Sequence, residues 1–258
     1  MFTDSHCHLN YKGLVEDQAG TIARARAAGV ATMLNISTRE SEWDAIVGTA
    51  ETDPDIWASI GIHPHEADAH PDVDTAKLVA KAAHPKVIAI GETGLDYYYD
   101  HSDRDRQRAS FRAHIAAARE TGLPLIVHTR DAEEDTAEIL ADEMGKGGYT
   151  GVIHCFTASG AFADKALNLG LYISLSGIVT FKNAKDLQET ARRIPESRLL
   201  IETDAPFLAP VPHRGKTCEP AFVADTARYL AELRGTSVEA LAETTTANFR
   251  TLFSKVGA

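Results

Sequence analysis

The chain has 258 residues, of which 44% are hydrophobic and 24% are charged, and its formal net charge is -11. This composition is typical of a globular protein and excludes a disordered or membrane-spanning chain, because no apolar stretch approaches the length of a membrane span. The negative charge argues against a broad electrostatic footprint on duplex nucleic acid, but it permits a local site where metal ions supply positive charge.

The cysteines form neither a disulfide framework nor a zinc-binding pattern. Cys7, Cys155 and Cys218 are far apart, odd in number and in no CxxC arrangement, which favours a reducing compartment. The first residues, MFTDSHCHL, have neither the basic region nor the apolar region of a signal peptide. We therefore expect a cytoplasmic protein that is not attached to a membrane, and we infer no obligate protein partner.

Short runs rich in valine and isoleucine alternate with longer helical patterns along the whole chain. In chain order, the runs predicted as strands are FTDSHCH, TMLNIS, WASIGIH, KVIAIGE, LPLIVHT, GVIHCF, YISLSG and RLLIETD. The segments between them include three clear helices: AGTIARARAAG with Gly29 as its C-cap, RQRASFRAHIAAARETG with Gly122 in that role, and DAEEDTAEILADEM with Asp131 as its N-cap. A last helix is expected over residues 236–253.

This alternation predicts a parallel sheet with crossover helices. The ends of successive predicted strands lie 22 to 36 residues apart, and eight such units fit a (β/α)8 TIM barrel of about 250 residues. A doubly wound sheet would usually have fewer strands and a glycine-rich first turn, and no GxGxxG follows the first strand. We therefore predict an α/β fold, a single TIM-barrel domain over residues 1–258.

Histidines and carboxylates stand at the ends of six predicted strands, where barrel enzymes build their active sites. A single histidine at a strand end is more often a satisfied polar residue than a ligand. Here, however, five of the eleven histidines fall at such ends. Two carboxylates also follow buried-looking runs, where a charge needs a partner such as a divalent cation. These residues are His6, His8, His63, Glu92, His128, His154 and Asp204.

The pair at the start of the chain shows how a strand would present such ligands. Side chains alternate between the two faces of a strand, so His6 and His8 would point the same way. Cys7 would then point into the layer between barrel and helices as a small apolar residue.

Imidazole and carboxylate together suit Zn, Mn, Fe, Ni or Co, whereas Mg is held more often by carboxylates and water. Six of these residues exceed the four ligands of a closed structural zinc site. Shared between two ions, they would leave open positions for two-metal hydrolysis, with one ion activating water. The sequence therefore predicts two divalent ions, from among Zn, Mn, Mg, Ni and Co, held by His6, His8, Glu92, His128, His154 and Asp204.

Seven ordered motifs carry a resemblance across essentially the whole chain. They are SHCHL, GIHPH, GETGLDYY, LPLIVHTRDA, GVIHCF, LLIETDAPFLAP and PHRGKTCEP. This set resembles the TatD family of metal-dependent deoxyribonucleases, within the amidohydrolase-like metallohydrolases. The resemblance implies a TIM barrel, a divalent metal cofactor, and hydrolysis of phosphodiester bonds, typically from the 3′ end of DNA. The implied substrates are DNA ends or single-stranded DNA.

The resemblance also implies a role for each ligand. One metal would be bound by His6, His8 and Asp204, a second by His128 and His154, and Glu92 would bridge the two. Asp204 and Glu92 are then the expected catalytic residues, with Asp204 as the general base that takes a proton from water.

Substrate contacts are expected from His63, Arg130 and Arg214, with the arginines suited to bidentate contacts with phosphate. The alternative for His63 is a hydrogen bond within its loop, and the alternative for Arg214 and Lys216 is a solvated loop. Cys218 stands in RGKTCEP where the family usually has asparagine, so the hydrogen bonds of that amide are absent here. The tyrosines at 97–99 would either stack on bases or pack against a long loop.

Three functions remain open from the sequence. The first is a nuclease acting at DNA ends, of the 3′-5′ exonuclease type. The second is a metal-dependent ester or amide hydrolase, such as a D-aminoacyl-tRNA deacylase, because barrel and ligands do not select the substrate. The third is a metal-stabilised barrel that binds a partner without catalysis, against which the open coordination of the ligand set argues.

Overall fold

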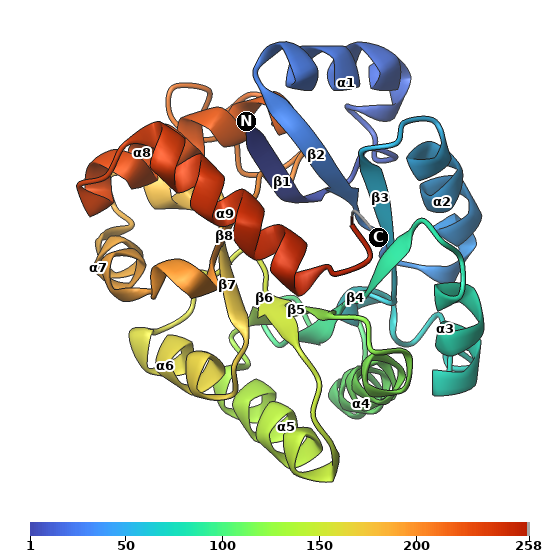
Figure 1. The fold of residues 1–258 in the computed structure, drawn as a ribbon. Coiled ribbons are helices and arrows are strands. Elements are labelled where there is room, and N and C mark those ends of the chain that lie inside the picture. Colours follow the sequence, from blue (N-terminus) through green and yellow to red (C-terminus); the bar gives the residue numbers. More distant parts are fainter. Residues whose placement is uncertain (257–258) are drawn as a thin grey trace.

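The computed structural model describes residues 1–256 and contains one sheet of eight strands, which follow one another in chain order (Figure 1). All neighbouring strands from the first to the eighth pair in parallel. The sheet nearly closes where Cys7 forms a bridge with Ala205. The predicted TIM barrel is therefore confirmed. The strands are β1 (Phe2–Cys7), β2 (Val30–Asn35), β3 (Ile56–Ile60), β4 (Val87–Asp96), β5 (Leu125–Arg130), β6 (Gly151–Ile153), β7 (Tyr172–Leu175) and β8 (Leu199–Ile201).

A helix follows each strand and covers the outside of the barrel, and an additional helix ends the fold (Figure 1). Gly122 is a left-handed C-cap, as predicted, and Gly29, with φ of +87°, directly follows the C-cap Ala28. Among residues 1–256, no helix has both the length and the apolar character to cross a membrane. The helices are α1 (Gln18–Ala27), α2 (Trp43–Glu51), α3 (Thr75–Ala82), α4 (Arg104–Thr121), α5 (Glu133–Lys146), α6 (Gly160–Asn168), α7 (Lys185–Arg193), α8 (Val223–Arg234) and α9 (Val238–Leu252).

Strand alternation divides the buried apolar side chains into two clusters. One cluster fills the layer between strands and helices and includes Cys7, which is fully buried. The other joins strand residues such as Leu34 and Ile126 to Phe249 and Leu252 of α9. Asn248 of α9 donates to the carbonyl of Leu199, at the start of β8. Helix α9 therefore closes the barrel at the amino ends of the strands and crosses in front of them in Figure 1.

The predicted end of the fourth strand is wrong, because β4 continues beyond Glu92 to Asp96. Between Ile90 and Thr93, the pairing of β4 with β5 shifts by one residue, which is a β-bulge. Gly91 in this bulge has φ of +133°, and a Cβ there would lie 2.6 Å from the carbonyl oxygen of Ile126. A side chain does not fit, and the bulge re-aims Glu92 within the strand.

Other strands end earlier than predicted: β3 at Ile60, β6 at Ile153 and β7 at Leu175. β8 ends at Ile201, so Asp204 lies in the turn that follows; its φ of 58° is incompatible with a continuing strand. Asp131 is not the N-cap of α5, because the residue before that helix is Ala132, without a side-chain cap. Asp131 itself has φ of 52° and belongs to the sharp turn between β5 and α5.

Candidate metal centre

Two histidines at the end of β1 and one carboxylate after β8 form the first group of the site. The Nε2 atoms of His6 and His8 lie 3.2 Å apart, and they lie 3.6 and 3.3 Å from Oδ1 of Asp204. Backbone pairing sets this arrangement, because Asp204 N–H donates to the carbonyl of His6 at 2.9 Å and His8 N–H donates to that of Ala205 at 2.8 Å. The closure of the barrel thus brings the three side chains together.

A second group comes from β5 and from the residue that follows β6. Nδ1 of His128 and Nε2 of His154 lie 3.4 Å apart. His154 also stacks on His6, with ring centroids 3.9 Å apart and 9° between the planes. The two groups are therefore direct neighbours.

Glu92 lies between the groups and presents one carboxylate oxygen to each. Its Oε2 is 3.4 Å from Nε2 of His6 and 3.9 Å from Nε2 of His8. Its Oε1 is 2.8 Å from Nε2 of His154 and 3.2 Å from Nδ1 of His128. All six sequence-predicted ligands are thus brought together, and Glu92 has the position expected of a bridge.

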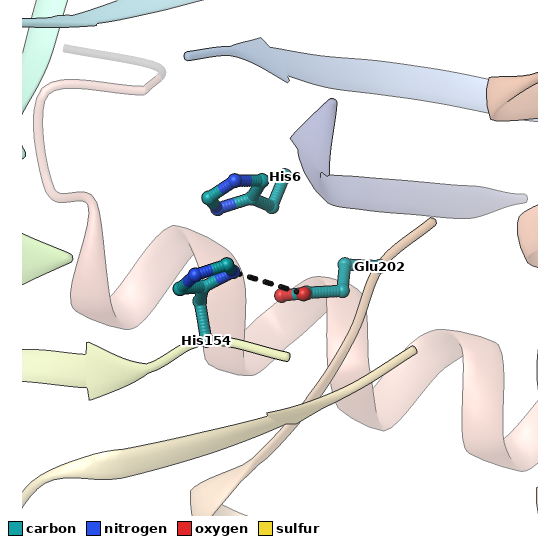
Figure 2. Close-up of side chains that lie close together, drawn as sticks. All are labelled: His6, His154 and Glu202. Atoms are coloured by element: carbon teal, nitrogen blue, oxygen red, sulfur yellow. Dashed lines mark hydrogen bonds and ion pairs between the residues drawn. The ribbon is translucent and has the colours of Figure 1, made fainter. Parts of the chain in front are cut away.

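Two buried carboxylates that sequence reasoning missed hold the second group from behind. Oδ2 of Asp96 lies 3.2 Å from Nε2 of His128 and 2.8 Å from Nε2 of His65. Oε1 of Glu202 lies 3.3 Å from Nδ1 of His154, as Figure 2 shows together with the ring of His6. Such carboxylate–histidine pairs fix the tautomer and orientation of a metal-binding imidazole.

A signal for both carboxylates was present in the sequence. Asp96 is four residues after Glu92 in β4, and Glu202 is two residues before Asp204. Even spacings in an extended chain place side chains on one face, so Asp96 points toward the same side of β4 as Glu92. The same rule applied to the predicted eighth strand pairs Glu202 with Asp204, although the structure places both residues after the end of β8.

The charges of the cluster depend on one another. Burial alone would raise the pKa of Glu92, but the charge of His154 and the other imidazoles holds that pKa well below its usual range. Burial works against a charge on His154 too, yet Glu92 and Glu202 raise its pKa well above the usual value. At His6 and at His63, burial prevails and lowers the pKa. Glu92 is therefore ionised, as a carboxylate that serves as a metal ligand must be.

The donor set fits divalent cations. A neutral imidazole has one unprotonated nitrogen, so in the tautomer protonated at Nδ1 the facing Nε2 atoms of His6 and His8 direct lone pairs at a common point. Three sets of ligand atoms lie within 4.8 Å of one another: His6, His8 and Glu92; His6, His154 and Glu202; His63, Glu92 and His128. Nitrogen and carboxylate donors together suit Zn, Mn, Fe, Co or Ni.

A cavity of about 710 Å³ opens above this cluster at the carboxyl ends of the strands. His63 and Arg130, two of the predicted substrate contacts, line it. Nε2 of His63 also lies 3.5 Å from Oε1 of Glu92, so His63 reaches the ligand cluster itself. Arg214 does not line the cavity, and its guanidinium lies 4.3 Å from the centre of the Phe181 ring.

Tyr97 and Cys218, which the sequence also singled out, pack within the protein and do not face the cavity. Tyr97 donates to Asp135 at 2.6 Å and packs against the core. Cys218 is fully buried, and its N–H donates to the carbonyl of Pro206 at 3.0 Å. The three cysteines are free.

A parallel barrel whose strand ends direct histidines and carboxylates at one cavity defines the class of barrel metallohydrolases. The chain matches the sequence model of the TatD-related DNases over residues 3–254. It belongs to this family of metal-dependent hydrolases.

Similar proteins extend over nearly the whole chain. The "Uncharacterized metal-dependent hydrolase YcfH" of Escherichia coli K12 is 46% identical over 253 residues, which cover 97% of this chain and 94% of that protein. The "3'-5' ssDNA/RNA exonuclease TatD" of Erwinia tasmaniensis is 35% identical, with coverage of 97% and 99%. The crystal structure of YjjV, a TatD homologue from Escherichia coli K12, superposes with a TM-score of 0.91 at 28% identity and covers 98% of each chain.

Proposed function

We propose that the protein is a divalent-metal-dependent deoxyribonuclease that cleaves phosphodiester bonds at the ends of single-stranded DNA, in the 3′-5′ direction. The proposal is carried by the position of Glu92. Each of its two carboxylate oxygens lies within 3.9 Å of ring nitrogens of a different pair of histidines. That arrangement suits two ions rather than one. The relative from Erwinia tasmaniensis, named as an exonuclease on single-stranded DNA and RNA, supports the substrate class.

In this proposal, the ligand roles follow the two groups. His6, His8 and Asp204 would hold one ion, His128 and His154 would hold the other, and Glu92 would supply a carboxylate oxygen to each. Divalent ions, when bound, supply Lewis-acid activation of water and of the phosphoryl oxygens. The open cavity above the cluster gives the scissile phosphate access to both groups.

Asp204 is the general base of the proposed reaction. Its side chain is 14% exposed, more than that of Glu92 at 3%, so it reaches the water of the cavity. Burial would raise the pKa of Asp204, but the hydrogen bond with His8 and the nearby imidazoles lower it. Asp204 is therefore ionised at neutral pH and accepts the proton of the attacking water.

Arg130 and His63 are the proposed phosphate contacts on the cavity wall, and we assign Arg214 at most a contact with a longer strand outside the cavity. The net charge of -11 offers no long basic track for duplex DNA. The protein therefore contacts a short terminal segment. The expected cytoplasmic location and the absence of an obligate protein partner stay predictions.

The test is cleavage of 5′-labelled single-stranded and duplex DNA by protein loaded with Zn, Mn, Mg, Ni or Co. The expected result is stepwise shortening of the single strand from its 3′ end. Asp204→Asn should slow it by at least about 100-fold, since general base catalysis typically contributes that much. Asp55→Asn, an exposed aspartate outside the cavity lining, is the matched control and should act like wild type.

Two outcomes would overturn the proposal. One is equal shortening by wild type and Asp204→Asn. The other is turnover of an aminoacyl ester far faster than of any DNA under the same metal conditions, which would establish the deacylase instead.

A further inference from the structure

An exposed aromatic ring stands on the wall of the candidate site, and no aromatic ring among residues 1–256 stacks on it. Phe207 lines the cavity and is 49% exposed. Exposing a large apolar ring to water costs free energy, and exposed apolar surface at a cavity typically marks a binding surface. Phe207 follows Asp204 by three residues, so it belongs to the turn that carries the proposed general base.

Tyr98 and Tyr99 are also exposed, at 56% and 49%, but they differ from Phe207 because each ring already has a partner stacked on it. The guanidinium of Arg130 lies 4.0 Å from the ring centre of Tyr98 and 4.8 Å from that of Tyr99. Tyr99 also stacks on His101, with 5° between the planes. The described aromatic neighbours of Phe207 are both edge-on: His8 at 6.3 Å and 71°, and Tyr11 at 6.1 Å and 87°.

The backbone of Phe207 is fixed relative to the cluster. Phe207 N–H donates to the carbonyl of Asp204 at 2.9 Å, which closes the turn. The carbonyl of Pro206 accepts from Cys218 N–H at 3.0 Å, which ties the turn to the following loop. The backbone is thus ordered before a substrate arrives, and only the side-chain rotamer remains to be ordered on binding.

We infer that Phe207 is a base-stacking residue, which takes the nucleobase next to the scissile phosphate of a single-stranded nucleic acid. The inference rests on the proposed function and names its substrate contact. A phosphate at the metal cluster would place its attached nucleoside beside a ring centred 6.3 Å from that of His8. Every base offers a flat face for stacking, so the contact tolerates any sequence. In a duplex the stacked and paired base is not free for this contact, so Phe207 favours single strands.

The test combines a protein change with a substrate change. Phe207→Leu removes the ring at an exposed position and keeps an apolar side chain, while Phe207→Tyr keeps a ring. Each protein is assayed on a single-stranded oligonucleotide and on copies with an abasic residue at the terminal or the penultimate 3′ position. A stacked base typically contributes enough for about a 5- to 100-fold effect.

The expected result is that Phe207→Leu lowers kcat/KM on the intact strand by about 5- to 100-fold. One of the abasic substrates should lower kcat/KM of the wild type by a similar factor. The two losses should not add, because each removes the same contact. Phe207→Tyr should stay within about threefold of wild type, since the stacking face remains. Tyr98→Leu is the matched control at an exposed ring outside the cavity lining, and any loss that it causes should be equal on intact and abasic strands.

A second readout does not depend on turnover. An oligonucleotide with 2-aminopurine at the sensitive position is titrated with wild type in chelator and with metal-loaded Asp204→Asn. Stacking should quench the fluorescence of that base with at least one of the two proteins. The same protein carrying the further substitution Phe207→Leu should show no quenching.

The outcomes separate this inference from the proposed function. If wild type shortens no DNA, the proposed function fails, and the inference fails with it. If wild type shortens DNA but Phe207→Leu loses equally on intact and abasic strands, or loses nothing, only the inference is overturned. Absence of quenching in both titrations overturns it as well.

Discussion

The two halves of the candidate centre hold their histidines in different ways. In the half formed with β5 and β6, a carboxylate lies beside the ring nitrogen that faces away from the cluster. Asp96 Oδ2 lies 3.2 Å from Nε2 of His128, and Glu202 Oε1 lies 3.3 Å from Nδ1 of His154. In the half formed with β1 and β8, Nδ1 of His6 and Nδ1 of His8 have no hydrogen-bond partner among residues 1–256.

One half of the centre is therefore oriented by side chains and the other by the backbone. His6 and His8 are placed by the pairing of β1 with the turn after β8, and their rings are held by stacking on His154 and Tyr11. A carboxylate behind a ligand also raises its basicity. Metal binding in the β5–β6 half should therefore depend on Asp96 and Glu202, whereas binding in the β1–β8 half should not.

The largest effect is expected from Glu92, the residue that both halves share. Glu92→Ala removes a carboxylate oxygen from each half and leaves the imidazoles without their negative partner. Because loss of an outer carboxylate already costs about 10- to 100-fold in metal affinity, loss of the bridge should cost more than about 100-fold at both ions. Metal content after purification, measured by inductively coupled plasma mass spectrometry, should fall to near zero.

Retention of one ion by Glu92→Ala would show that the halves bind independently and that Glu92 is no bridge. Thermal melting of wild type and variant in chelator serves as the control, because the metal-free proteins must both be folded for the comparison to hold.

The next effect separates the halves directly. Asp96→Asn and Glu202→Gln keep the size of each side chain and remove its charge. Each should weaken metal binding in the β5–β6 half about 10- to 100-fold, because the imidazole beside it loses its fixed tautomer and its raised basicity. Isothermal titration calorimetry of the metal-free protein with Zn²⁺ should show the other event unchanged. Equal weakening of both events by either variant would contradict the division into halves.

The sequence predicted the barrel and placed all six predicted ligands at one rim of it, because the alternation of strands and helices is readable from the local pattern. It could not predict how Glu92 reaches both halves. That depends on the bulge in β4, which arises from the close approach of Gly91 to Ile126 in the neighbouring strand. A contact between strands is not encoded in the periodicity of either one.

One of the outer carboxylates, Asp96, was missed for a related reason, because the fourth strand was predicted to end at Glu92 and a residue beyond a strand has no defined face. Glu202 lay inside the predicted eighth strand, where nothing in the pattern distinguishes an outer carboxylate from a ligand. Likewise, Asp204 was assigned to a strand, although its φ of 58° places it in a turn. Phe207 reads in the sequence as one more apolar residue, and only its exposure on the cavity wall distinguishes it.

His114, a histidine outside the centre, has neighbours at both ring nitrogens and can be compared with His6 and His8, whose Nδ1 atoms have none among residues 1–256. His114 in α4 is fully buried, its Nε2 accepts from Ile62 N–H at 2.9 Å, and its Nδ1 faces the carbonyl of Ser110 at 2.7 Å. Burial lowers the pKa of His114 from 6.5 to about 4, despite the Ser110 carbonyl. Between these values the unfolded chain binds a proton there that the folded state does not, so stability is lost as pH falls.

This shift should cost the metal-free protein about 2 kcal/mol of unfolding free energy between pH 7 and pH 5. His114→Gln should remove that part of the pH dependence, measured by urea unfolding at both pH values. His70→Gln, a change at a half-buried loop histidine, is the control and should leave the pH dependence as in wild type. An identical slope in wild type and His114→Gln would show that His114 does not resist protonation.

The smallest effect concerns the ring that stands behind His8. Tyr11 stacks on His8 with centroids 4.6 Å apart, and its hydroxyl lies 2.6 Å from that of Thr38. If the β1–β8 half is oriented by stacking rather than by hydrogen bonds, Tyr11→Phe should leave its metal affinity within about twofold. Tyr11→Leu should lower it about two- to tenfold, as expected for losing one aromatic contact. Both are measured by the same calorimetric titration. A larger loss in Tyr11→Phe than in Tyr11→Leu would mean that the hydroxyl, through Thr38, orients His8, and the backbone-held half would then rely on hydrogen bonds as its partner does.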